Sequence, residues 1–157
     1  MERIDSLGEE AKVLVKICSC FGFEFRQESL ENIAPAFLSS KDPSHLETIM
    51  ETLAARSLVV PVTGESVSKM MKFTHQIITE CAHNLMLDSQ RRQVHRAIVE
   101  EYENSSVKFE MDVLAFHWLR SGEVERGCAM LQNAAIKAKE MSAYKECVNS
   151  LSQAIAY

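Results

Sequence analysis

Histidine and cysteine are the residue types in this sequence that could bind a metal or activate a nucleophile. Zinc ligands usually come in pairs roughly two to five residues apart, with a second pair elsewhere in the chain. Cys81 and His83 come nearest to such a pair, but residues two apart on a helix point about 200° away from each other. No serine and no Cys–His pair has the local spacing of an activated nucleophile. We therefore expect no metal site and no catalysis by this chain alone, although groups distant in the sequence can meet in a fold.

The cysteines do not form a disulfide framework. They are odd in number and irregularly spaced, at Cys18, Cys20, Cys81, Cys128 and Cys147. Most of them fall on or near apolar helix faces, where a free thiol behaves as a small hydrophobic group. We interpret them as reduced, structural residues, and a metal or redox role is the alternative.

A phosphate-binding loop is missing from the sequence. The glycines, at Gly8, Gly22, Gly64, Gly122 and Gly127, never fall into the pattern G-x-x-x-x-G-K-[ST]. The chain also lacks the α/β scaffold on which a nucleotide cyclase would hold its metal ions. We expect no cofactor.

Three histidines are assigned structural roles. His75 lies between a short β-like run and a helical pattern, and we expect it to form a hydrogen bond that fixes this turn. His95 and His117 lie within helical patterns, and we expect them to be partly buried between helices.

Three arginines lie in the first half of a predicted helix whose second half is acidic: Arg91, Arg92 and Arg96. This order opposes the helix dipole, which favours anions at the N-terminus and cations at the C-terminus. One interpretation is a solvated face with incidental polarity. The functional hypothesis is that these arginines contact carboxylates on a neighbouring domain.

The charge balance argues against nucleic acid as a partner. The net charge is −5, whereas a nucleic-acid binder usually presents a basic face to the phosphates. The helix predicted over 44–56, which would read DNA in a winged helix, displays Glu47 and Glu51. No apolar run approaches the roughly 20 residues of a membrane helix, and the N-terminus has no secretory pattern. We expect a cytoplasmic protein with no membrane partner.

Apolar spacing and turn residues predict a mainly α-helical chain. Capping signals at Ser6 and Ser44 are predicted to start two of the helices. The apolar pairs Ile77/Ile78, Cys81/Ala82 and Leu85/Met86 are predicted to form one broad stripe. The predicted helices cover 6–22, 28–34, 44–56, 75–86, 88–104, 112–120, 123–140 and 142–155. Extended segments are predicted over 23–25, 58–62 and 70–74, with a turn at 63–68.

This order predicts three units. Residues 1–87 form a winged-helix-like domain of three helices and a β-hairpin. Residues 88–104 form a connecting helix, and residues 105–157 begin an array of helix pairs of tetratricopeptide type. The last predicted helix carries an apolar stripe that nothing after it covers. Either this helix folds back on its predecessor or the chain is a fragment of a longer array, and we favour the fragment.

One stretch also resembles a known family. Phe73-x-His75-x-Ile77-Ile78, Glu80-x-Ala82, Leu85 and Gln90-Arg91-Arg92-x-x-His95 are similar to a signature that follows the P-loop ATPase domain in large signalling proteins of the STAND type, including soluble adenylyl cyclase and its relatives. There the signature joins a winged-helix-like domain to tetratricopeptide-like repeats.

The resemblance implies a non-catalytic regulatory or scaffolding role in cAMP signalling. The winged-helix-like domain would contact the protein's own upstream ATPase module, the repeats would contact other proteins, and the parent protein would be an adenylate cyclase. The alternatives are the equivalent segment of an ATPase-type transcriptional regulator and a free-standing helical adaptor.

Overall fold

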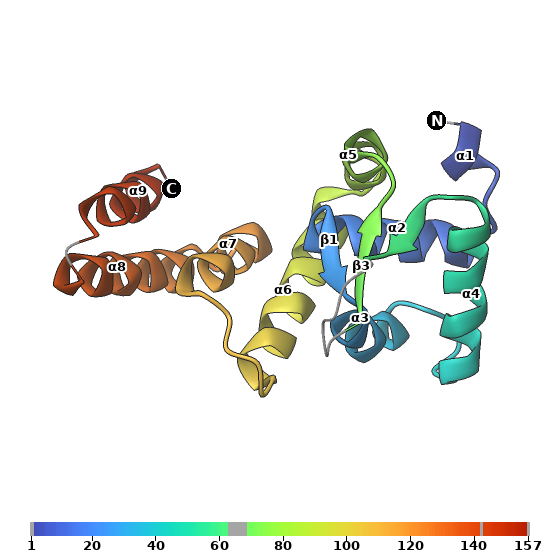
Figure 1. Ribbon diagram of the computed structural model, residues 1–157, viewed down its shortest axis with the longest axis horizontal. Helices are drawn as coiled ribbons and strands as arrows, with labels where there is room; N and C mark the ends of the chain where they lie inside the picture. The colour runs from blue at the N-terminus through green and yellow to red at the C-terminus, as the bar shows by residue number, and fades with distance from the viewer. Residues whose placement is uncertain (1, 63–68, 142, 157) are drawn as a thin grey trace. The chain divides into compact units, whose positions relative to one another are not determined.

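A computed structural model describes residues 2–62, 69–141 and 143–156 of the chain. The protein is mainly helical, with a small three-stranded antiparallel sheet (Figure 1). It divides into two compact units, Met1–Arg91 and Arg92–Tyr157. The division falls within helix α6 (Asp88–Asn104), which the sequence analysis assigned to a connecting segment.

The first unit holds the sheet and the helices around it (Figure 1). Its elements are α1 (Glu2–Asp5), α2 (Glu9–Phe21), β1 (Glu24–Arg26), α3 (Gln27–Ile33), η1 (Ala34–Ala36), α4 (Pro43–Ala55), β2 (Val59–Pro61), β3 (Met70–Phe73) and α5 (Gln76–Asn84). Its core gathers side chains from most of these elements, and the following are at most 2% exposed: Leu14, Phe25, Leu30, Leu53, Leu58 and Phe73.

The sheet has the strand order β1-β3-β2. The predicted pairing of the segments at 58–62 and 70–74 is confirmed, with Val60 opposite Lys72. Pro61 lies on the edge strand β2, where its missing N–H removes no bond from the sheet centre. The turn predicted at 63–68 lies outside the described residues. Strand β1 pairs with the other side of β3, a pairing that was not predicted from the sequence.

Both predicted capping residues were wrong. Helix α2 begins after Gly8 with no side-chain cap, and the hydroxyl of Ser6 accepts a hydrogen bond from Arg56 Nη1 at 2.7 Å. Helix α4 is capped by Asp42, whose carboxylate accepts from the backbone N–H of Ser44 at 3.0 Å. The reason at α4 is Pro43, which is favoured at the first helical position and so makes the preceding residue the cap.

The broad apolar stripe predicted for α5 is narrower in the structure. Ile78, Ala82 and Met86 are buried, but Ile77 is 61% exposed and Leu85 is 39% exposed. Adjacent residues on a helix point about 100° apart, so a single packing surface covers only one member of each pair.

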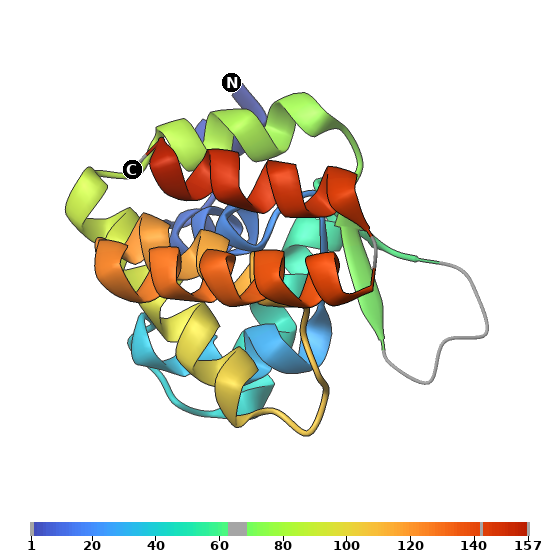
Figure 2. The same ribbon diagram turned by 90° about the vertical axis from the view of Figure 1, so that its left-hand side faces the viewer.

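The second unit packs three further helices after the end of α6. They are α7 (Met111–Ser121), α8 (Val124–Glu140) and α9 (Tyr144–Ile155). Helix α8 packs against both α7 and α9, and Figure 2 shows α8 (orange) and α9 (red) side by side. Gly122 ends α7 in the left-handed conformation, with φ of 94°, which glycine adopts without a Cβ clash. The small core between these helices comprises Ala115, Leu119 and Leu131.

Close packing of α7 on α8 depends on Gly127. A Cβ at this position would lie 2.6 Å from Leu119 Cγ and 3.1 Å from Leu119 N. We expect Gly127→Ala to destabilise the second unit by about 2 kcal/mol. The added Cβ would crowd both the side chain and the backbone of Leu119, so overpacking should cost about 3 kcal/mol, the upper end of its usual range, against a gain of about 1 kcal/mol in helix propensity. Urea unfolding followed by the fluorescence of Trp118, the single tryptophan, measures this change.

Gly8→Ala is the matched control. No atom lies within 4 Å of a Cβ built at Gly8, so we expect a change below about 1 kcal/mol. Equal stability of Gly127→Ala and the wild type would contradict the packing argument.

Candidate interaction surface

The predicted arginine cluster is paired largely within the chain. Arg91 forms an ion pair with Asp88 in the first turn of α6. Arg96 pairs with Glu100 and with Glu123 of the second unit, each at 3.0 Å. Hydrogen bonding to Glu100 and the charge of Glu123 raise the pKa of Arg96. Exposed pairs of this kind stabilise little, and they offset the unfavourable dipole arrangement locally. Contact of Arg91, Arg92 and Arg96 with another domain stays a prediction.

His75 occupies the N-cap position of α5. Its backbone is extended and its carbonyl accepts from the N–H of Ile78 at 3.0 Å, but its side chain makes no capping hydrogen bond. The turn is instead held by Thr74, whose hydroxyl donates to the carbonyl of Ser57 at 2.8 Å and whose N–H donates to that of Leu58 at 3.1 Å. His75 therefore lies at the turn between β3 and α5, and a side-chain hydrogen bond at this turn comes from its neighbour Thr74.

His95 and His117 are more deeply buried than predicted. Each is 2% exposed, and their Nδ1 atoms lie 2.9 Å apart, so one ring donates this hydrogen bond and the other accepts it. Tyr102 meets the edge of His117, and Phe109 stacks on Tyr102 with centroids 3.7 Å apart. Burial lowers the pKa of His117 to about 4, so this ring is neutral near pH 7. The cluster is a packed core of the second unit.

A second polar arrangement surrounds Trp118, which is fully buried. Its indole N–H donates to Glu103 at 2.9 Å, and the guanidinium of Arg126 lies 3.9 Å from the ring centroid. Arg126 also contacts Glu103 at 3.4 Å. Each polar group has its partner within the second unit, so the arrangement is structural.

The second unit also contains a groove of about 430 Å³. It lies between the start of α7, the second half of α8 and the start of α9. The residues that line it are Glu110, Met111, Asp112, Ala134, Lys137, Ala138, Met141, Ala143, Glu146 and Ser150. Three of these are acidic and one is basic, while methionine and alanine supply an apolar floor. They include no imidazole or thiol that could serve as an acid, base or nucleophile.

Helix α9 exposes apolar side chains on another face. Val148 is 61% exposed, Leu151 42% and Ile155 85%, and their spacing places them on one side of the helix. A different side of α9 packs on α8, where Cys128 Sγ lies 3.6 Å from the carbonyl of Ala154. This exposed stripe corresponds to the apolar stripe predicted for the last helix.

Small residues of α8 lie at or near this groove. Ala135 is buried in the core, whereas Ala134 and Ala138 line the groove. The acidic residues of the groove were not predicted as site residues from the sequence. Glu110 and Glu146 lie in different segments, and only the fold brings them to one groove.

Within the described ranges, no helix combines the length and apolar character that a membrane crossing requires. Comparisons of the chain with protein-family models, curated proteins and solved structures found no match.

Proposed function

We propose that the chain is a non-catalytic regulatory or scaffolding segment of a multidomain signalling protein and that it acts through protein–protein contacts. The observation that carries this proposal is the acidic groove formed by α7, α8 and α9. It is open, it has an apolar floor, and its chemistry is suited to recognition.

The groove fits a basic amphipathic segment of a partner protein. Glu110, Asp112 and Glu146 outweigh the single cation Lys137, so lysine or arginine side chains would be attracted to the rim. Met111 and Met141 are 40% and 72% exposed, and flexible thioether side chains adapt to varied apolar partners. In a partner segment with an apolar residue between two basic residues, the basic side chains would contact the acidic rim and the apolar side chain would contact the methionines.

The family proposal draws on the order of elements. In the first unit a helix, a short strand, two helices and a β-hairpin follow one another, an order that supports a winged-helix-like domain. In the second unit, consecutive helices pack as neighbours, which supports a start of tetratricopeptide-like repeats. Together with the resemblance of 73–95, this favours a segment that follows an ATPase module in a cytoplasmic protein similar to soluble adenylyl cyclase.

The sequence that flanks this chain in its gene tests the family proposal. Cyclase and P-loop ATPase domains upstream would support it. A DNA-binding domain at the end of the reading frame would instead support the transcriptional-regulator alternative.

Binding of a synthetic peptide tests the groove. The probe is a fluorescein-labelled amphipathic helix of leucine, alanine and lysine, and the control peptide has glutamate in place of lysine. We expect the chain to bind the lysine peptide and Asp112→Lys/Glu146→Lys to weaken binding about tenfold or more at low salt. The matched control is Glu125→Lys, an exposed position on α8 outside the groove. Equal binding of both peptides, or equal loss in the control variant, would refute the acidic groove as the site.

A further inference from the structure

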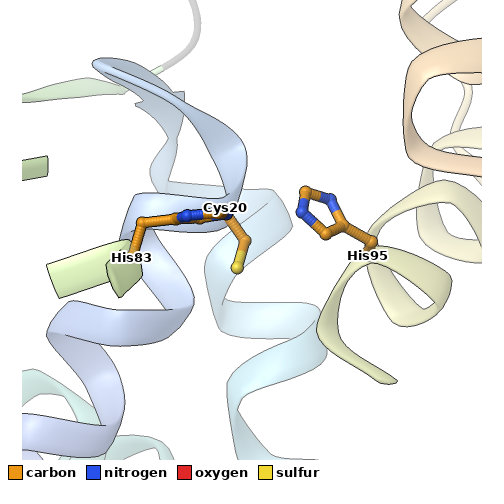
Figure 3. Close-up of side chains that lie close together, drawn as sticks. All are labelled: Cys20, His83 and His95. Atoms are coloured by element: carbon orange, nitrogen blue, oxygen red, sulfur yellow. The ribbon is translucent and has the colours of Figure 1, made fainter. Parts of the chain in front are cut away.

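The first unit brings together three side chains that are typical ligands of a soft metal ion. Cys20 lies near the end of α2, His83 near the end of α5, and Met86 just after it. The Sγ atom of Cys20 is 3.6 Å from the Sδ atom of Met86, and a ring nitrogen of His83 lies within 4.8 Å of this Sγ atom. Figure 3 shows Cys20 and His83 close together; it also draws His95, a residue of the second unit.

These separations fit a three-coordinate metal centre. Bonds of about 2.0–2.3 Å from a metal to sulfur or nitrogen place trigonal ligands roughly 3.5–4.0 Å apart. The sulfur–sulfur distance of 3.6 Å already has this value, and the nitrogen of His83, within 4.8 Å of the Cys20 sulfur, would complete the centre by moving closer to the ion.

The chemical type of the three ligands indicates which metal ion this site would bind. Thiolate and thioether sulfur are soft donors that favour Cu(I). Zinc is held by cysteine, histidine and carboxylate ligands, and a methionine thioether is not among them. A centre that includes Met86 therefore distinguishes Cu(I) from Zn²⁺.

A polar pocket gives access to His83. It has a volume of about 360 Å³ and is lined by Ser19, Thr79, Glu80, His83 and Asn84. Thr79 is 6% exposed, and its hydroxyl has no hydrogen-bond partner among the described residues. A buried hydroxyl in this position is a place where a water molecule or an entering ligand can be held. The pocket thus connects solvent with the imidazole.

We propose that Cys20, His83 and Met86 of the first unit form a binding site for Cu(I). The ion replaces the thiol proton of Cys20, which leaves to solvent; the sulfur becomes a thiolate ligand and copper stays in the Cu(I) state. Burial raises the pKa of the Cys20 thiol to about 12, so the metal-free thiol is protonated near pH 7. Binding therefore releases one proton to solvent. This site is independent of the acidic groove.

The test is competition for Cu(I) between the reduced full chain and bicinchoninate under anaerobic conditions. Because other thiols can bind Cu(I), the reference protein carries Cys81→Ser, Cys128→Ser and Cys147→Ser. We expect it to remove one equivalent of Cu(I) from the chelator. Met86→Leu, which keeps every remaining thiol and the apolar volume, should weaken binding at least about tenfold, and Cys20→Ser at least about a hundredfold.

His83→Asn is the third variant, and Met71→Leu is the matched control, a buried methionine on β3. His83→Asn should also weaken binding, whereas Met71→Leu should not change it. Circular dichroism checks the fold of each variant, and the Met86 and His83 variants decide the question if Cys20→Ser does not fold. Binding that is unaffected by Met86→Leu and His83→Asn, or no binding to the reference protein, would overturn the proposal.

Discussion

Trp118→Ala is expected to lower the free energy of unfolding of the second unit by about 3–5 kcal/mol, the range for truncating a buried large aromatic residue. Trp118 is fully buried on α7. Its removal would leave a cavity, deprive Glu103 of the indole N–H, and remove the ring on which Arg126 lies. Because the variant lacks the fluorescent reporter, urea unfolding is followed by far-ultraviolet circular dichroism.

Phe116→Ala is the control for this prediction. Phe116 lies on the same helix but is 46% exposed, so its truncation leaves no closed cavity, and we expect a loss below about 1 kcal/mol. Similar losses of unfolding free energy in the two variants would contradict this prediction. They would show that truncating an exposed aromatic residue of α7 destabilises the unit as much as truncating the buried Trp118.

Local pattern was a good guide to which segments form elements. The hairpin partners at 58–62 and 70–74 were predictable because extended runs, a proline and a glycine-containing turn lie within about fifteen residues of one another. The pairing of β1 with β3 was not predictable in this way. Phe25 and Met71 face each other across a separation in sequence that no local spacing reveals.

Capping shows why locally correct signals can still fail. The Ser6 signal competes with Arg56, which is fifty residues away in sequence and binds the hydroxyl in the fold. At α4 the competition is local, because Asp42 precedes a proline and takes the position that was assigned to Ser44.

The candidate sites were less predictable from the sequence than the helices and strands, because the residues of each site come from different helices. Cys81 and His83 are close in sequence, but residues two apart diverge on a helix. The structure instead places His83 beside Cys20 of α2, and Met86 beside the same thiol. A local search for ligand pairs does not test such combinations.

Acidification is the second large effect that we expect. Burial lowers the pKa of His117 to about 4 from an ordinary value of 6.5. Between these two values the unfolded chain binds more protons than the folded chain, so stability falls as the pH falls. The stabilisation is complete above about pH 6.5 and is lost towards pH 4, by about 3 kcal/mol in total, since one pKa unit corresponds to about 1.4 kcal/mol.

The groups around the ring explain why protonation is unfavourable. His117 is enclosed by His95 and the rings of Tyr102 and Phe116, none of which is an anion near neutral pH. Both imidazoles cannot be protonated while their Nδ1 atoms share a hydrogen bond, because neither would then have an acceptor. Urea unfolding followed by Trp118 fluorescence between pH 7 and pH 4 measures the loss.

The slope of the unfolding free energy against pH is compared between the wild type and His117→Gln. The remaining titratable groups contribute to both proteins, so the difference between the two slopes is the contribution of His117. We expect the variant to be less stable than the wild type at pH 7, because packing is lost. Its unfolding free energy should also fall less steeply between pH 6.5 and pH 4. His45→Gln is the control, since His45 pairs with Glu10 in the first unit. For this variant, the unfolding free energy measured by Trp118 fluorescence should depend on pH as steeply as in the wild type. If stability depended on pH equally in the wild type and in His117→Gln, His117 would have the same pKa in the folded and unfolded chains. Burial of this ring could then not be the source of the acid sensitivity.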